Sequence, residues 1–280
     1  MTDLLIAGGL TIDRFADGST APGGSVIHAG RAASAEGVRP TFVTVAGDEP
    51  EAREGLSILA AMGSVDHRPA GATTRYAHQE VDGRRVLVYE GAGGSIALEA
   101  VGPVGAIEAA LLAPIADELP AAAVLALIDS VRPRLTVLLV QGWLRRLGIG
   151  EPARPLALGE IPDATWEAFA AADAIVVSTE DLAESPEDPF VEAAALRERL
   201  GPRPLLVLTL GAQGYLLDDP GADRVVASVP RRVVAGVPTV GAGDTFGAAL
   251  AIHLGRGASP QVAAAAATER VIRVLESRRA

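Results

Sequence analysis

An aspartate in the first turn of a helix, directly behind two glycines, is the arrangement in this sequence best placed to do chemistry. The segment Gly241–Asp244 reads Gly-Ala-Gly-Asp and leads into an apolar helical run. Glycines let the backbone turn sharply with its N–H groups pointing outward, and a helix N-terminus carries roughly half a positive charge. The segment predicts an anion site with a carboxylate beside it. Taken alone, Asp244 is also explained as a helix cap, worth about 1 kcal/mol.

Two further features bear on which class of ligand this anion site would bind: a second glycine loop, and a position where a dinucleotide-binding motif would require glycine. A dinucleotide-binding Gly-x-Gly-x-x-Gly motif would need glycine at position 246, where Phe246 stands, which disfavours that class. The loop Thr209–Gly214 follows an apolar run and would let backbone amides approach phosphates. This loop is a weak signal by itself, and its value lies in its pairing with Gly241–Asp244.

Two residue types are missing, and their absence excludes several mechanisms. All 24 basic residues are arginine, and there is no cysteine. A P-loop, a protein-kinase site and a pyridoxal Schiff base each require a lysine. Disulfides, thiolate nucleophiles and cysteine-ligated zinc require cysteine. If the protein handles ATP, another device must therefore hold the phosphates.

Alternating apolar runs and helical patterns must position these residues. The runs are apolar throughout, as strands buried on both faces are, and the alternation predicts an α/β fold: a doubly wound, mostly parallel sheet with helices on both faces. The predicted strands are Leu4–Ala7, Thr41–Val45, Leu135–Val140, Ala174–Val177 and Leu205–Leu208. The predicted helices are Val26–Glu36, Glu49–Met62, Trp166–Ala171, Phe190–Leu200, Ala248–Leu254 and Gln261–Glu276.

Two stretches, near residues 10–24 and 72–94, interrupt the alternation. The second predicts a hairpin, because the alternating segments Tyr76–Val81 and Arg84–Tyr89 flank an Asp-Gly pair at 82–83. Such a hairpin is either an ordinary surface excursion or a small β lid over the site. Since nothing resembles an interdomain linker, we expect residues 1–280 to form a single domain that carries these lid segments.

Composition and charge indicate a small-molecule partner. The net charge of −11 argues against nucleic acid, and 4% aromatic residues leave little for base stacking. The 49% hydrophobic content supplies a core, yet no run of about 18 apolar residues could cross a membrane. The first residues lack a basic leader with an apolar run. We therefore expect a cytoplasmic protein without a membrane partner.

Five motifs, in order along nearly the whole chain, resemble the ribokinase-like (pfkB) carbohydrate kinases. They are Gly8–Asp13, Gly23–His28, Val45–Asp48, Thr209–Gly214 and, as the most specific, Gly241–Phe246. The resemblance implies an ATP- and Mg²⁺-dependent kinase that moves the γ-phosphate to a hydroxyl of a sugar or polyol.

The resemblance also implies a role for each matched residue. Asp244 would be the catalytic base, and the N–H groups of Gly241, Ala242 and Gly243 would stabilise charge on the transferred phosphoryl group. The implied substrate-binding residues are Asp13, Gly23, Gly24, His28 and Arg145. Thr209, Gly211 and Gly214 would line the ATP phosphates, while Asp181 or Glu180 would organise Mg²⁺ through water.

Four positions depart from the family pattern. His28 stands where the family commonly has asparagine, and the segment that ends at Asp181 replaces an Asn-x-x-Glu motif. Pro238 replaces an aspartate associated with a monovalent cation, so potassium activation is not expected. Where sugar kinases often show an Asp-x-Asn-x-Arg motif, this sequence has only the arginine, Arg145. The alternatives are a buried polar side chain for His28, a helix cap for Glu180 or Asp181, and a solvated side chain for Arg145.

Several segments indicate a particular subgroup of the family, although two alternative functions stay open. Gly23–Val26, Thr73–Tyr76 and Gln141–Arg145 are similar to myo-inositol kinase-like members. A nucleoside kinase of the same fold and a non-catalytic sugar-binding or regulatory homologue are the alternatives. The family also implies a possible homodimer through the lid.

Overall fold

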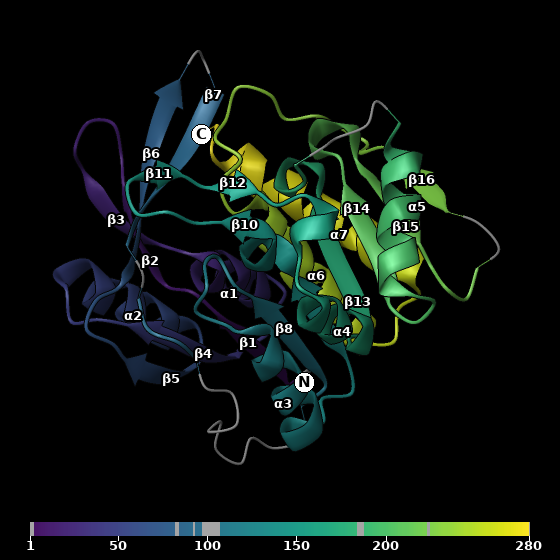
Figure 1. Cartoon of the computed structure of the whole chain (residues 1–280), viewed down its shortest axis with the longest axis horizontal. Helices are drawn as coiled ribbons and strands as arrows, with labels where there is room; N and C mark the ends of the chain where they lie inside the picture. The colour runs from purple at the N-terminus through teal and green to yellow at the C-terminus, as the bar shows by residue number, and fades with distance from the viewer. Residues whose placement is uncertain are drawn as a thin grey trace.

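A nine-stranded sheet forms the centre of the computed structural model (Figure 1), which describes residues 3–81, 84–91, 93–96, 107–183, 188–222 and 225–279. In spatial order its strands are β16 (Val226–Ser228), β15 (Tyr215–Asp218), β14 (Leu205–Thr209), β13 (Ala174–Ser178), β9 (Thr136–Leu139), β8 (Ala109–Ala113), β1 (Leu4–Gly8), β4 (Thr41–Ala46) and β5 (Ser64–Pro69). From β14 to β5 neighbouring strands run parallel, whereas β15 and β16 add an antiparallel edge. The predicted mostly parallel sheet is confirmed.

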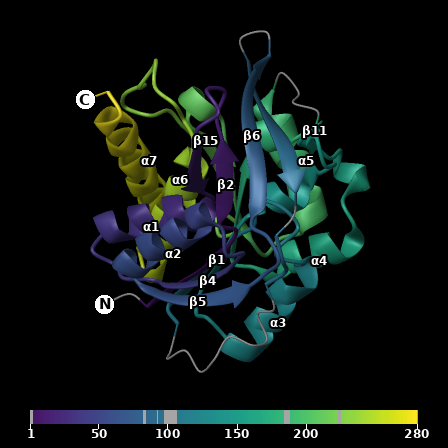
Figure 2. The ribbon, with the colours of Figure 1, turned by 90° about the vertical axis from the view of Figure 1, so that its left-hand side faces the viewer.

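Helices cover both faces of this sheet (Figure 2). One face carries α1 (Ser25–Ala35), α2 (Pro50–Met62), α6 (Ala242–Gly255) and α7 (Pro260–Ser277), and the other carries α3 (Ala121–Val131), α4 (Asp163–Ala171) and α5 (Pro189–Leu200). Alternate side chains of each strand enter the two cores: Ile6 packs on the first face and Leu5 on the second. Because both faces are buried there, central strands such as β1 and β8 are apolar throughout rather than alternating.

The two interrupting stretches pair into a second, smaller sheet. Its strands are β11 (Glu151–Pro152), β7 (Arg84–Gly91), β6 (Thr74–Val81), β2 (Thr11–Arg14) and β3 (Thr20–Gly23), in that order. The predicted hairpin pairing of β6 with β7 is confirmed, while its turn at 82–83 lies outside the described residues. The fully buried Tyr76 joins the small sheet to the main one, since its hydroxyl donates to Ile115 O at 2.8 Å.

Several elements differ from the sequence prediction, and β5, β15, β16 and the helix α3 were not predicted. The short alanine-rich strand β8 was also not predicted, because a five-residue apolar run carries no clear periodicity. Helix α6 begins at Ala242, six residues before its predicted start. Gly247 does not interrupt this helix: a Cβ there would lie 2.3 Å from Leu139 Cδ2, so the glycine lets α6 pack closely on β9.

Short elements connect the strand ends to the site. They are the short 3₁₀ helices η2 (Val140–Leu144), η3 (Leu158–Glu160), η4 (Thr179–Asp181) and η5 (Gly211–Gln213), and the two-stranded ribbon of β10 (Arg145–Arg146) with β12 (Arg154–Pro155).

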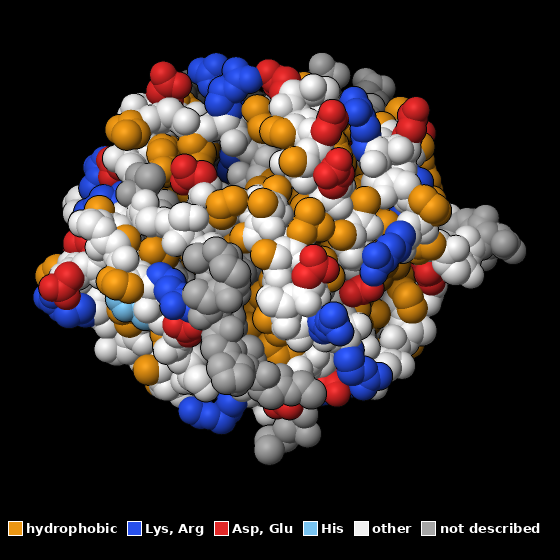
Figure 3. Space-filling model, turned by 60° about the horizontal axis from the view of Figure 1, so that its bottom comes forward, with side chains coloured by type: hydrophobic (Ala, Val, Ile, Leu, Met, Phe, Trp, Pro, Cys, Tyr) orange, Lys and Arg blue, Asp and Glu red, His pale blue; other side chains and the backbone are white. Residues whose placement is uncertain are grey.

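On the face in Figure 3, acidic and basic side chains are interspersed with apolar ones. None of the described helices combines the length and apolarity that a membrane span requires.

Candidate active site

The predicted site residues gather at the carboxyl edge of the main sheet. Asp13 lies beyond β1, Arg145 beyond β9, Asp181 beyond β13 and Thr209 at the end of β14. In open α/β sheets the crevice outside the carboxyl ends of the strands is where ligands bind. The fold therefore brings residues from distant parts of the chain to one edge of the main sheet.

Helix α6 begins with the predicted anion-binding turn. Gly241 is its N-cap, with a φ of 76° that strongly favours glycine. The N–H of Ala242 donates to Thr239 O at 3.0 Å, so this group is already used within the turn. The backbone hydrogen bonds of this turn use neither the Gly241 N–H nor the Gly243 N–H. One of the three predicted donors, that of Ala242, is thus engaged by the turn itself.

The carboxylate of Asp244 sits one residue beyond these donors, in a confined position. Burial raises its pKa from the ordinary 3.8 to about 7; the charge of Arg145 opposes the rise and that of Asp181 adds to it. The residue nevertheless keeps some solvent-accessible surface, as a group that must meet a substrate requires. A carboxyl with a pKa near neutrality is suited to accept a proton in a reaction at physiological pH.

Arg145 and Asp181 form an ion pair beside Asp244. Arg145 Nη2 lies 3.2 Å from Asp181 Oδ1, and both side chains are nearly buried, with 14% and 10% exposed. Burial raises the pKa of Asp181, and Arg145 works against that rise. This pairing explains the surviving arginine as part of a charge network, rather than as the solvated side chain that was the alternative.

Asp13 lies in the small sheet and is held by close neighbours. Asp13 is 8% exposed and accepts a hydrogen bond from Thr11 Oγ1 at 2.8 Å. Its Oδ2 lies 3.1 Å from His78 Nε2 and fills the space above Gly23, where a Cβ would come within 2.4 Å of it. Gly24, at φ 99°, leaves room for the carbonyl of Gly9. Both glycines thus have a packing role in addition to the predicted substrate role.

His28 lies against the anion-binding turn. It stands in the first turns of α1, four residues after Gly24, and its ring contacts Gly241. A Cβ on Gly241 would come within 2.2 Å of His28 Cγ. The family's asparagine position is therefore occupied here by a ring that packs against Gly241.

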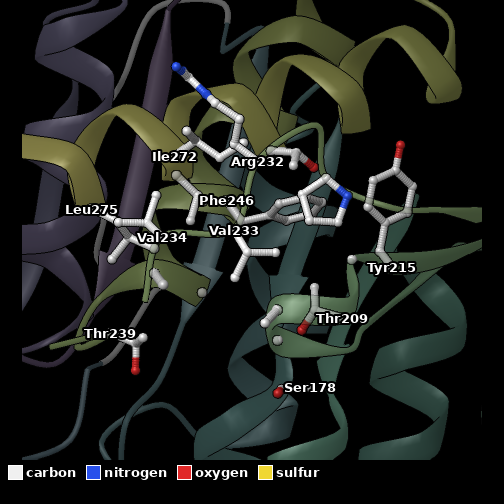
Figure 4. Close-up of a pocket in the computed structure, with 18 of the residues that line it drawn as sticks. Ser178, Thr209, Tyr215, Arg232, Val233, Val234, Thr239, Phe246, Ile272 and Leu275 are labelled. Carbon is white, nitrogen blue, oxygen red and sulfur yellow. The ribbon is translucent and has the colours of Figure 1, made fainter. Parts of the chain in front are cut away.

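A cavity of about 310 Å³ opens between the two glycine segments. Thr209, Gly211 and Gly214 line one side and Ala242 and Gly243 another. Figure 4 shows that the remaining wall is largely apolar, and its labelled members include Tyr215, Val233, Val234, Phe246, Ile272 and Leu275. Such a cavity matches the size and lining of small-molecule sites, with a polar floor and an apolar slot.

The loop Thr209–Gly214 has a conformation that depends on its glycines. Gly211 and Gly214 have φ values of 57° and 104°, and a Cβ on Gly214 would lie 2.0 Å from Ser228 O. Leu210 N donates to Gly214 O at 2.8 Å, which closes the turn. The predicted glycine loop thus lines one side of the cavity.

The two predicted metal residues differ in their surroundings. Glu180 is exposed and lines the cavity, whereas Asp181 is buried against Arg145. Within the described ranges, no three acidic or histidine side chains gather into a metal cluster. Magnesium bound to a nucleotide typically uses one or two carboxylates plus phosphates and water, so Glu180 fits such an ion better than Asp181 does.

Comparisons with known proteins show the family and the fold. A family model described as pfkB family carbohydrate kinase matches residues 9–269. The chain belongs to the pfkB family. As a pfkB carbohydrate kinase it is a phosphotransferase with an alcohol group as acceptor. No curated protein matches the sequence.

Solved structures share the fold of this pfkB kinase. A pyrophosphate-dependent kinase in the ribokinase family, complexed with a pyrophosphate analog and myo-inositol, matches with a TM-score of 0.73 at 16% identity, over 95% of this chain and 92% of that chain. Fructokinase from Vibrio cholerae O395 gives 0.72 at 19% over 99% of each chain. Arabidopsis thaliana ribokinase, complexed with ribose and ATP, gives 0.68 at 18% over 99% of each chain.

Sequence reasoning missed the apolar wall of the cavity. One signal was present: Thr268, Val271, Ile272 and Leu275 recur at helical spacing and define one face of α7. That spacing is usual for a face packed into a core, so sequence alone could not assign it to a cavity.

Proposed function

We propose that this pfkB kinase transfers the γ-phosphate of ATP to a hydroxyl of a sugar or cyclic polyol, with Asp244 as the base. The observation that carries the proposal is the cavity, which ends at the N-terminal turn of α6, one residue before Asp244. An acceptor oxygen attacks the γ-phosphorus, the bond from that phosphorus to the bridging oxygen of ADP breaks, and Asp244 takes the hydroxyl proton. Gly241 and Gly243 N–H groups would stabilise the transferring oxygens.

The apolar wall of the cavity supports a nucleotide donor. The glycine-lined floor suits phosphates, and Tyr215, Phe246 and Ile272 supply a slot for a flat base. One of the structures compared above depends on pyrophosphate and another binds ATP. Pyrophosphate has no group that would use an apolar slot, which is why we favour ATP. Magnesium, held near Glu180, would neutralise charge on the phosphates.

The small sheet is the proposed acceptor end. The carboxyl oxygens of Asp13 can accept hydrogen bonds from hydroxyl groups, and His78 beside it adds a second polar group. This polar pair suits a sugar or cyclic polyol such as myo-inositol better than a nucleobase.

A coupled phosphate-transfer screen tests the proposal. The acceptors are pentoses, hexoses, inositols and nucleosides, each tried with ATP and with pyrophosphate in the presence of Mg²⁺. Turnover of a sugar or inositol with ATP is the expected result. Preference for a nucleoside or for pyrophosphate would correct the acceptor or the donor. No turnover, together with sugar binding in calorimetry, would indicate the non-catalytic alternative.

Replacing Asp13 should affect one substrate selectively. We expect Asp13→Ala to raise the acceptor KM by about tenfold or more, because a charged hydrogen-bond partner is worth roughly 1.5–3 kcal/mol. The KM for ATP should change little, because Asp13 does not line the cavity proposed for the nucleotide. Steady-state kinetics in both substrates measure this difference, and equal effects on both KM values would place Asp13 elsewhere.

The pH dependence of the reaction should reveal the ionisation of the Asp244 carboxyl. The base must be ionised to accept a proton, and the pKa of Asp244 is raised to about 7. We therefore expect kcat/KM for the acceptor to fall by about tenfold per pH unit below that pKa and to level off above it. Rates measured from about pH 5 to about pH 9 check this, and a flat profile through neutrality would contradict it.

A further inference from the structure

We propose that Arg278 is a positioning residue for phosphoryl transfer, because its guanidinium holds the backbone carbonyls that orient the anion-binding turn. The inference rests on the proposed function, since it assigns the support of that same turn. Arg278 directly follows α7 and is distant in sequence from its partners. Its Nη1 donates to Pro238 O and its Nη2 donates to Val240 O, the latter at 2.8 Å.

The contact with Val240 acts directly on the turn. The Val240 carbonyl and the Gly241 N–H belong to the same planar peptide unit, so holding one fixes the direction of the other. A charged donor on that carbonyl also polarises the N–H, since hydrogen bonds in a chain strengthen one another. On its other side Gly241 is confined by the ring of His28. Arg278 and His28 together fix a donor in the anion-binding turn.

The loop before this turn needs external support. Residues 231–240 contain no helix or strand, and most of them are exposed. Side chains near the end of α7 contact this loop: Arg278 holds Pro238 and Val240, Arg279 Nη2 donates to Ala235 O at 2.8 Å, and Glu276 pairs with Arg232. Thr239 lies between the two carbonyls that Arg278 holds and also lines the cavity, so Arg278 supports one wall of the donor site as well.

The guanidinium occupies a place where a monovalent cation could otherwise bind. Two carbonyl oxygens that converge on one positive centre satisfy either a guanidinium or an alkali ion, and Pro238 offers no side-chain oxygen for a metal. Burial, and then the charge of Arg31, lower the pKa of Arg278, as expected for a partly desolvated cation. A fixed charge on the chain thus makes an added cation unnecessary.

The test compares Arg278→Ala with Arg279→Ala, a neighbour that holds the same loop farther from Gly241. Each protein is assayed in sodium, potassium or tetramethylammonium chloride at matched ionic strength, and with guanidinium far below denaturing concentrations. The wild-type enzyme should be indifferent to the cation. Arg278→Ala should lose about tenfold or more in kcat, short of the 10²–10³-fold typical for removing a direct donor. Guanidinium or potassium should restore part of that loss, and Arg279→Ala should show neither the loss nor the rescue.

Several outcomes would overturn the inference. Equal kcat in the two variants would do so, and so would a loss in Arg278→Ala that follows its melting temperature and is not rescued, because that pattern marks a purely structural role. If Arg278→Ala does not fold, Arg278→Lys replaces it: a compact ammonium should hold the two carbonyls less well, and full activity would contradict the proposal. Absence of wild-type turnover would instead count against the proposed function.

Discussion

Asp244→Asn should reduce turnover by about 10²-fold or more, the range for loss of a positioned base, while binding of both substrates is retained. The amide keeps the size of the side chain but cannot accept the hydroxyl proton. Single-turnover measurement of phosphate transfer separates this chemical step from binding. Unchanged turnover in the variant would remove Asp244 from the mechanism.

The effect of Asp244→Asn on the stability of the fold should depend on pH, and the direction of this effect follows from the raised pKa of Asp244. The native pKa of Asp244, about 7, lies above the ordinary 3.8, so the native state binds its proton more tightly than the unfolded chain does. The contribution of Asp244 to stability is therefore lost as the pH rises from about 3.8 to about 7. Above that window the ionised, buried carboxylate destabilises the fold. Asp244→Asn should then melt at a higher temperature than the wild type at alkaline pH, and the difference should shrink in acid.

Gly241→Ala should lower turnover by about 10²-fold, because it displaces a donor of the anion-binding turn. The new Cβ would lie within 2.2 Å of the His28 ring, and the φ of 76° is unfavourable for alanine. Either the ring or the turn must move. Initial rates at saturating substrates give the loss in kcat directly.

Gly236 provides the matched control for this prediction. Its φ of 75° equals that of Gly241 within a degree, but a Cβ there would meet no atom within 4 Å. Gly236→Ala carries only the backbone strain, about 1–2 kcal/mol, and should keep most of the activity. The double variant Gly241→Ala with His28→Ala should recover part of the lost turnover, because the ring no longer occupies the space of the new Cβ. An equal loss in both single glycine variants would show that strain, rather than the contact with His28, is responsible.

Dimerisation through the small sheet, a cytoplasmic location and the single-domain organisation of residues 1–280 stay predictions. The exposed Phe15, directly after β2, packs against His78 with the two rings tilted and their centroids 5.1 Å apart, so the surroundings of Asp13 are close to the surface that a partner subunit would cover. Sedimentation of the wild-type protein would measure the oligomeric state.

The sequence by itself determined the elements whose signals are local. Apolar runs such as Leu205–Leu208 predict buried parallel strands, and Gly241–Asp244 predicts an anion-binding helix start, because backbone turns and helix ends are set by neighbouring residues. The hairpin of β6 and β7 followed from an Asp-Gly pair between alternating segments. Strand β8, equally central, was missed because its five alanines and leucines fit strand and helix alike.

Only the tertiary structure decided which distant residues act together. Arg145 meets Asp181, His28 meets Gly241 and Arg278 meets Val240 across 36 residues or more of chain, and no local pattern encodes such contacts. The pKa of Asp244 likewise depends on burial, Arg145 and Asp181 together. The apolar wall of the cavity depends on α7 returning to pack beside β15 and α6. Chemistry at the site thus arises where the ends of parallel strands bring separate segments to one edge, a property of the assembled sheet rather than of any segment.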